Sequence, residues 1–350
     1  MNKSNYEIQE KQNILKLREV LKELPAYCSN FMRGIENHTS SLTRLNYAYD
    51  IRLFLEYICK EIAHDPSRKP SSVALSELDE LTALDIEVYI EFLTLYQKQD
   101  KEFSNQESGK SRKIASLRSF FKYLYKHGLL SANVTTLIEM PQIHEKAIIR
   151  LEPDEVARLL DVVESGQSLS ETQKRYHKHT KLRDLALMTL FLGTGIRISE
   201  LVGVNITDID FETNGFKITR KGGNQVVLYF GEEVEKALKQ YLDDRRNIEP
   251  QAGHEDALFL SLQKTRLSVR SVQQIVKKYT KLIAPLKNIS PHKLRSTYGT
   301  MLYQQTGDIY LVASVLGHKD VNTTKKHYAA MTDDQRRRAA KAVKLRDDEN

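Results

Sequence analysis

Apolar residues recur three and four positions apart along most of this 350-residue chain, and this helical periodicity fades between Leu129 and Glu152. The fading stretch contains Pro141, and Pro153 followed by two acidic residues then indicates a new helix start. A chain of this length can bury two separate cores. The pattern therefore predicts a helical domain over 1–140, a linker over 141–152 and a second domain over 153–350.

The clearest helix of the first domain is expected from Ser111 to Lys126. Its apolar face carries Ile114, Leu117, Phe121 and Leu124. Arg112, Lys113, Arg118 and Lys122 supply charge along the helix. Two interpretations stay open: a core helix with a solvated rim, or a helix whose basic side also contacts nucleic-acid phosphates.

The second domain combines helices with one expected β-hairpin. Two runs of alternating character, Gly215–Thr219 and Gln225–Phe230, flank the turn Lys221-Gly222-Gly223-Asn224. An apolar helix precedes them and ends at Gly195, and the polar run 164–180 is expected to be a surface loop. The fold class is therefore mainly α, with a small β-sheet in the second domain.

Composition narrows the class of protein. Hydrophobic residues make up 40% and charged residues 28% of the chain, which is typical of a folded protein. No apolar stretch is long enough to span a membrane, and the first ten residues are polar, so we expect a cytoplasmic protein without a membrane partner. The two cysteines, Cys28 and Cys59, exclude a disulfide framework or a zinc cluster. The net charge of +7 is compatible with a polyanionic partner.

Five short segments of the second domain each place a side chain able to bind phosphate beside a residue that constrains the backbone. They are GTGIRISEL (193–201), TRKGGN (219–224), SPHKLRS (290–296), LGHK (316–319) and TTKKHY (323–328). Each segment alone has a simpler structural explanation, such as a surface arginine after a glycine turn. Their order along the chain is what makes the set specific.

In that order the segments resemble the tyrosine recombinases, the lambda-integrase and Xer family. The resemblance covers about residues 150–340 and implies a helical core-DNA-binding domain followed by an α+β catalytic domain. The implied catalytic residues are Arg197, Lys221, His292, Arg295, His318 and the nucleophile Tyr328. The interval from His318 to Tyr328 is one residue longer than is usual in the family. Two other tyrosines, Tyr298 and Tyr310, are expected to be core residues.

Phosphoryl chemistry explains why these residue types are needed. Attack on a phosphodiester builds negative charge on the nonbridging oxygens, which the bidentate guanidiniums of Arg197 and Arg295 stabilise. The phenol of Tyr328 has an ordinary pKa near 10, so it needs a base, and His292 is the candidate. Lys221 is the candidate acid for the leaving 5′ oxygen.

Two further side chains have supporting roles in this scheme. His318 is expected to donate a hydrogen bond to the phosphate. Glu200 is expected to orient His292 or an arginine, although a surface or helix-capping role explains it nearly as well. The sequence has no nucleotide-binding glycine loop, no zinc spacing and no acidic cluster for two magnesium ions, so no cofactor and no metal are expected.

Within the family, residues 290–331 are most similar to the single-protein Xer recombinases, the XerS type. This resemblance implies chromosome dimer resolution at a dif-like site in double-stranded DNA. It also implies a homotetramer that binds two such sites and exchanges strands through a Holliday junction, with an FtsK-type DNA translocase as partner. The alternatives are a mobile-element integrase, a non-catalytic DNA-binding protein of the same fold, and a type IB topoisomerase. A mobile-element integrase often has an additional arm-binding domain, and the start of this chain offers too few residues for one.

Overall fold

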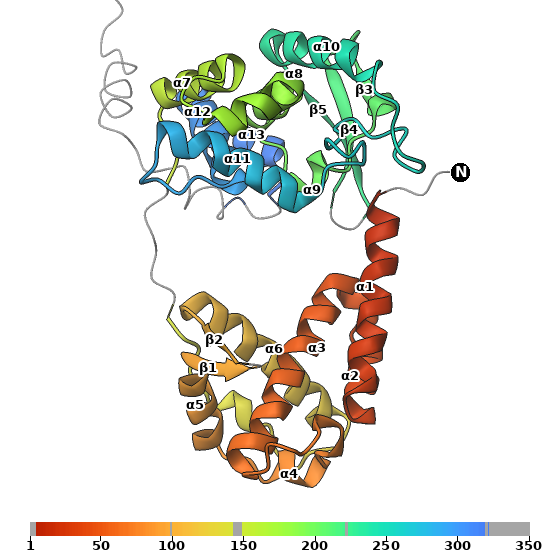
Figure 1. Ribbon diagram of the computed structural model, residues 1–350. Coiled ribbons are helices and arrows are strands. Elements are labelled where there is room, and N and C mark those ends of the chain that lie inside the picture. Colours follow the sequence, from red (N-terminus) through yellow and green to blue (C-terminus); the bar gives the residue numbers. More distant parts are fainter. Residues whose placement is uncertain (1–4, 99, 143–148, 221–222, 319–320, 322–350) are drawn as a thin grey trace, which may run out of the picture. The chain divides into compact units, whose positions relative to one another are not determined.

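The computed structural model describes residues 5–98, 100–142, 149–220, 223–318 and 321 (Figure 1). The chain divides into two compact units, Met1–Lys146 and Ala147–Asn350. Each unit has its own cluster of buried apolar side chains. None of the helices in the described ranges is long and apolar enough to cross a membrane.

The first unit is a helical bundle. Helix α1 (Asn5–Lys22) packs against α3 (Ser41–Tyr57), and α3 packs against α6 (Glu107–Lys126). The remaining α-helices of the unit are α2 (Ala26–Gly34), α4 (Leu75–Asp79) and α5 (Ala83–Phe92). The predicted apolar face of α6 is buried, with Ile114, Leu117, Phe121 and Leu124 each at most 1% exposed. Helix α6 is therefore a core helix of this unit.

Short elements interrupt the bundle. A π-helical turn, η2 (Ile58–Ile62), extends α3, and 3₁₀ turns lie at η1 (Glu36–His38), η3 (Pro70–Ser72) and η4 (Val134–Thr136). The sequence did not predict the two-stranded hairpin of β1 (Leu95–Lys98) and β2 (Lys101–Ser104). Its strands are too short and too exposed to show an alternating pattern, and an aromatic contact between Tyr96 and Phe103 joins them across the hairpin.

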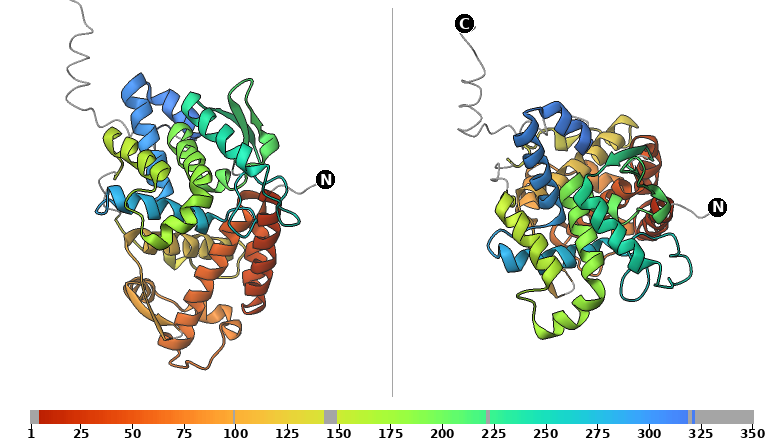
Figure 2. Two further views of the ribbon diagram at one scale, coloured as in Figure 1. Left: turned by 45° about the horizontal axis from the view of Figure 1, so that its top comes forward. Right: turned by 90° about the horizontal axis from the view of Figure 1, so that it is seen from above.

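The second unit surrounds one long helix, α8 (Glu171–Thr194), which packs against α7 (Pro153–Ser165), α10 (Glu232–Arg245) and α12 (Pro291–Thr306) (Figure 2). Shorter helices are α9 (Ile198–Leu201) and α13 (Ile309–Leu316), and α11 (Val269–Ile283) packs against α7. The eleven buried residues of α8 lie almost all in its second half. This helix is the centre of the unit.

The expectation that residues 164–180 form a surface loop holds only for 166–170, because α7 extends to Ser165 and α8 covers 171–180. Helix α8 already begins at Glu171, where the Ser170 hydroxyl accepts from the backbone N–H of Gln173 and the Gln173 side chain accepts from the Ser170 N–H. This capping box starts a helix in a polar sequence. The first turns are polar because they are mostly exposed, yet His177 and Thr180 are buried. Polarity was therefore a poor guide here.

The predicted hairpin is present as β4 (Gly215–Thr219) and β5 (Gln225–Tyr229), paired antiparallel from Gly215 with Tyr229 to Thr219 with Gln225. A two-residue strand, β3 (Ile209–Asp210), adds a third member after the 3₁₀ turn η5 (Ile206–Asp208). The mainly helical, two-domain architecture with small antiparallel sheets confirms the predicted fold class.

Candidate active site

Two of the predicted site residues, Arg197 and Arg295, contact the C-terminal end of α13, directly before His318. Gly317 adopts a left-handed conformation (φ +61°). Its N–H donates to the Ser314 carbonyl, and the His318 N–H donates to the Ala313 carbonyl, each at 3.0 Å. These two bonds form a Schellman motif, which ends a helix and turns the chain sharply. The turn fixes the backbone of His318, whose side chain is half-buried.

The side chain of Arg197 contacts this turn. It lies at the N-cap of α9, just after the α8 helix ends at the left-handed Gly195. Its Nη2 donates to the Gly317 carbonyl at 3.0 Å, and its Nη1 pairs with Glu200 at 2.9 Å. Glu200 also accepts from the Arg197 backbone N–H at 3.0 Å. The buried Glu200 therefore caps α9 and orients this arginine at the same time.

Arg295 also contacts this turn and is 5% exposed. Its guanidinium donates to the carbonyl oxygens of Gly195 and Leu316. The Gly195 backbone has φ +60°, and an added Cβ would lie 2.4 Å from Tyr298 and 2.9 Å from Leu316. Only glycine fits there, because both the conformation and the close approach exclude a side chain. The guanidiniums of Arg197 and Arg295 thus bind consecutive carbonyls, those of Gly317 and Leu316, next to His318.

Of the other predicted catalytic residues, the structure describes His292. His292 lies in the first turn of α12, three residues before Arg295, with an exposed side chain. Residues three apart on a helix share a face, so His292 projects from the same side of α12 as the buried arginine. Lys221 and Tyr328 lie outside the described residues.

Sequence analysis missed Arg220, the residue before Lys221. Its Nη2 donates to the Val315 carbonyl at 3.1 Å, so a third guanidinium reaches the end of α13. Burial lowers the pKa of Arg220 below its ordinary value; the carboxylate of Glu200 opposes this shift and the charge of Arg197 adds to it. The sequence places Arg220 at the base of the predicted hairpin. No residue pattern, however, indicates its contact with Val315, which lies 95 positions away in the sequence.

The cluster carries excess positive charge. Arg197, Arg220 and Arg295 approach one turn, and the carboxylate of Glu200 is paired with the first of them. Arginine stays charged even when it is partly buried. A fixed group of guanidiniums beside a helix end and two histidines is suited to bind an oxyanion such as a phosphodiester and to stabilise its developing charge.

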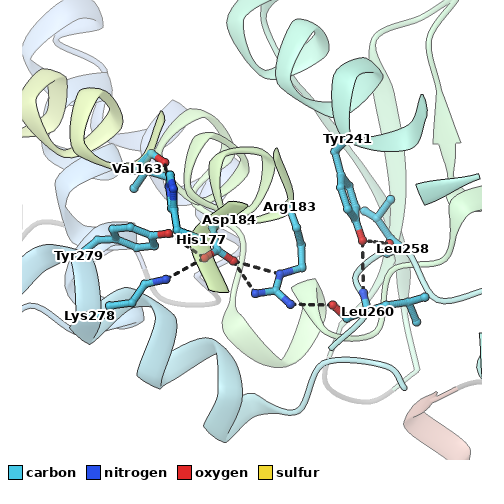
Figure 3. Close-up of polar contacts among 9 residues, drawn as sticks. All are labelled: Val163, His177, Arg183, Asp184, Tyr241, Leu258, Leu260, Lys278 and Tyr279. Carbon is cyan, nitrogen blue, oxygen red and sulfur yellow. Dashed lines mark hydrogen bonds and ion pairs between the residues drawn. The ribbon is translucent and has the colours of Figure 1, made fainter. Parts of the chain in front are cut away.

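A buried polar network holds α8, the helix that leads into Arg197 (Figure 3). Asp184 of α8 accepts from Arg183 at 2.7 Å, and from Lys278 and Tyr279 of α11 at 3.0 and 2.9 Å. Arg183 also donates to the Leu260 carbonyl at 2.9 Å. Each polar group of this cluster therefore has a partner drawn from a different part of the unit, which fixes the helix in place.

The four basic residues of α6 that were predicted to contact phosphates lie in the other unit, and three of these four bond within it. Arg112 donates to both carboxylate oxygens of the buried Asp50, Lys113 donates to Asn105 at 3.0 Å, and Arg118 donates to the Ile138 carbonyl. The side chain of Lys122 is exposed. The structure thus supports the core interpretation of this helix and leaves the phosphate contacts a prediction.

The two other tyrosines differ from each other. Tyr298 is half-buried beside Leu316, and burial raises the pKa of its phenol above the ordinary value, so it is a poor nucleophile. Tyr310 is 71% exposed, and the expectation that it is a core residue is wrong. It occupies the outer face of α13, whose inner face buries Val312 and Leu316.

Comparisons with known proteins agree with this geometry. Residues 149–335 match the model of the phage integrase family, which is more than half of the chain. The chain belongs to this family. Tyrosine recombinase XerC of Caldanaerobacter subterraneus is 33% identical to it over 337 residues, which cover 93% of this chain and 86% of that protein. Tyrosine recombinase XerD of Oceanobacillus iheyensis is 29% identical, covering 85% and 90%. The protein is therefore a tyrosine recombinase, an enzyme of site-specific recombination.

Solved structures of the family share the fold. The Tn1549 transposon integrase, in a complex with circular intermediate DNA, superposes with a TM-score of 0.60 at 20% identity, over 91% of this chain and 99% of that one. The XerH recombinase bound to its difH substrate gives 0.60 at 18% identity, over 92% and 95%. The similarity extends over both units of the chain.

Proposed function

We propose that this recombinase cuts and rejoins double-stranded DNA through a 3′-phosphotyrosine intermediate at Tyr328. One observation carries the proposal: Arg197 and Arg295, 98 positions apart in the sequence, both donate to the turn that precedes His318. Three of the five segments, 193–201, 290–296 and 316–319, therefore contact one another. Such a cluster is the electrostatic requirement for phosphoryl transfer.

In the proposed cleavage step the Tyr328 oxygen forms a bond to phosphorus while the bond from phosphorus to the 5′ oxygen breaks. His292 accepts the phenol proton, and Lys221 donates a proton to the departing 5′ oxygen. Arg197 and Arg295 stabilise the charge on the nonbridging oxygens. Resealing is the reverse, with a different 5′ hydroxyl as the attacking group.

Two residues support these steps. His318 donates a hydrogen bond to the phosphate. Glu200 orients Arg197, because one of its carboxylate oxygens accepts from the guanidinium and the other from the backbone N–H of that residue. Because the phosphotyrosine ester keeps the energy of the broken linkage, resealing requires neither ATP nor a metal ion. We therefore propose that the reaction uses no cofactor.

We also propose the division of labour between the domains. Residues 1–140 form the core-DNA-binding domain, 141–152 the linker and 153–350 the catalytic domain. The Tn1549 integrase and XerH were each solved on DNA, which supports DNA as the substrate of this chain. Lys122 is the best-placed residue of α6 for a phosphate contact because its side chain is exposed. Arg112, Lys113 and Arg118 would first have to exchange their contacts within the domain.

The biological reaction that fits best is chromosome dimer resolution at a dif-like site, by a homotetramer that passes through a Holliday junction and is activated by an FtsK-type translocase. The relatives named XerC and XerD and the difH complex of XerH support this assignment. The resemblance to the XerS type adds that one protein serves both halves of the site. A mobile-element integrase is the alternative, favoured by the likeness to the Tn1549 integrase.

The decisive experiment traps the protein on nicked duplexes that carry dif-like sequences, in EDTA. We expect a covalent complex with the wild-type chain and none with Tyr328→Phe, because the nucleophilic oxygen is missing. A covalent complex with the Phe variant would contradict the assignment of the nucleophile. Strict dependence on magnesium would contradict the mechanism.

The same assay separates the alternatives. Cleavage of dif-like duplexes in preference to element-end sequences supports dimer resolution, and the reverse preference supports the integrase. Relaxation of supercoiled DNA without sequence preference would indicate a type IB topoisomerase. Specific binding without any covalent complex would indicate a non-catalytic DNA-binding protein.

A further inference from the structure

We propose that Arg220 is a positioning residue that ties the base of the β4–β5 hairpin to the end of α13 and so holds Lys221 at the scissile phosphate. The inference rests on the proposed function, because the role of Lys221 as the acid belongs to it. Arg220 itself was not among the residues that the sequence motifs indicated. It belongs to segment 219–224, and its side chain joins this segment to the end of α13.

The backbone of Arg220 closes the hairpin. Its N–H donates to the Asn224 carbonyl at 2.8 Å, and its own carbonyl accepts from the Gly223 N–H at 3.0 Å. Gly223 has φ +84°, a conformation that favours glycine. Arg220 is therefore the last residue of the hairpin ladder, and the next residue in the sequence is Lys221.

The side chain of Arg220 reaches the end of α13. In addition to the bond to Val315, the guanidinium lies directly against Gly317: a Cβ added to that glycine would be 2.1 Å from Nη1 and 2.3 Å from Cζ. The absence of a side chain at Gly317 thus makes room for Arg220. The charge also faces the carbonyl end of a helix, where a cation is favourable.

The end of α13 depends less on Arg220 than the base of the β4–β5 hairpin does. The end of α13 is also held by Arg197 through the Gly317 carbonyl and by Arg295 through the Leu316 carbonyl. Removing Arg220 leaves both of those contacts in place, but it removes the contact of the hairpin base with Val315 and Gly317. The loss should therefore affect the step that uses Lys221 more than the steps that use His318 or the arginines.

That step is protonation of the leaving 5′ oxygen. In a substrate whose bridging 5′ oxygen is replaced by sulfur, the bond from phosphorus to sulfur breaks and the sulfur departs as a thiolate. A thiolate is far less basic than an alkoxide, so it can leave without being protonated and this substrate does not need the acid. Comparing the two leaving groups thus isolates the contribution of the lysine.

The test measures single-turnover formation of the covalent complex on a nicked dif-like duplex, with oxygen or sulfur at the bridging position. Arg220→Met removes the guanidinium and keeps the length of the side chain. Lys217→Met is the matched control, because Lys217 is an exposed residue of β4 and its loss removes the same charge from the same hairpin. Arg220→Lys keeps the charge but not the planar fork of donors.

We expect Arg220→Met to cleave the oxygen substrate at least about tenfold more slowly than the wild type, because displacement of a catalytic group by ~1 Å can cost ~100-fold. On the sulfur substrate its rate should return to within about twofold of the wild type. Arg220→Lys should be intermediate, and Lys217→Met should behave as the wild type. Equal rates for Arg220→Met and wild type on oxygen, or an equal loss on both substrates, would overturn the proposal.

Hydrogen exchange tests the tie without DNA. The amides of Arg220 and Gly223 close the hairpin, and we expect them to exchange at least about tenfold faster in Arg220→Met than in Lys217→Met, because local opening sets exchange rates. Unchanged exchange would overturn the proposal even if cleavage slowed. If the wild type forms no covalent complex, the proposed function fails, while the exchange result still decides whether the tie exists.

Discussion

Arg295 shows how one side chain serves both the fold and the site. Its guanidinium is almost fully buried and binds the carbonyls of Gly195 and Leu316, which belong to the turns that follow α8 and α13. A buried carbonyl that loses its donor retains the cost of desolvation. The residue that is proposed to stabilise the phosphate therefore also joins the C-terminal ends of α8 and α13.

Replacing Arg295 with Met should destabilise the second unit as well as abolish cleavage. Two carbonyls are left unpaired, at ~1–3 kcal/mol each, so the free energy of unfolding should fall by about 2–6 kcal/mol. Urea denaturation of the full chain, followed by circular dichroism, measures this change. The control is Arg158→Met, which removes an exposed i,i+4 pair with Asp154 and should change stability by less than about 0.5 kcal/mol. A loss of activity without a loss of stability would contradict the structural role.

At the scale of elements, α8 and α11 are joined by the carboxylate of Asp184. Burial alone would raise the pKa of Asp184, but Arg183 and Lys278 outweigh it and hold the pKa below its ordinary value. Tyr279 donates to the same carboxylate, and its ring contacts that of His177 on α8 (Figure 3). A carboxylate with a lowered folded-state pKa stabilises the protein when it is ionised.

We expect Asp184→Asn to lower the free energy of unfolding by about 3 kcal/mol near neutral pH, because the buried cations lose their partner. The contribution of the wild-type carboxylate is complete above its unfolded-state pKa, near 3.8, and is lost as the pH falls through the lower folded-state pKa. The stability difference between the two proteins should therefore narrow below about pH 4. Urea titrations of both proteins across this range check it, and a constant difference would contradict the ionised state of Asp184.

At the scale of the whole molecule, each unit has its own core. The chain carries a formal net charge of +7. If both domains contact the DNA backbone, affinity comes mainly from lysine and arginine on phosphates, with release of bound counterions. Such binding weakens steeply as salt rises.

We expect the dissociation constant for duplex DNA to increase by at least about 100-fold between roughly 50 and 200 mM salt. Lys122→Ala should reduce the slope of log affinity against log salt by about one, whether or not the duplex carries a recognition site. Fluorescence anisotropy with labelled duplexes measures both. A slope of zero would remove the phosphate contacts from the proposal.

Local patterns in the sequence were enough to predict most of the secondary structure and the order of the motifs. The apolar face of α6, the hairpin of β4 and β5, and the helix start at Pro153 depend on residues a few positions apart, so the information lies within each segment. The same reasoning failed where local signals were weak or ambiguous. The hairpin of β1 and β2 is too short to show a period, and polar residues hid the first turns of α8.

The sequence by itself determined which side chains are available for phosphoryl chemistry and in what order they occur. Only the tertiary structure decided that Arg197, Arg220 and Arg295 converge on the end of α13, that Glu200 binds Arg197, and that Arg112 is held by Asp50 within its own unit. These contacts join residues from separate elements, and their geometry depends on how helices pack. Packing is a property of the whole core, and no single segment encodes it.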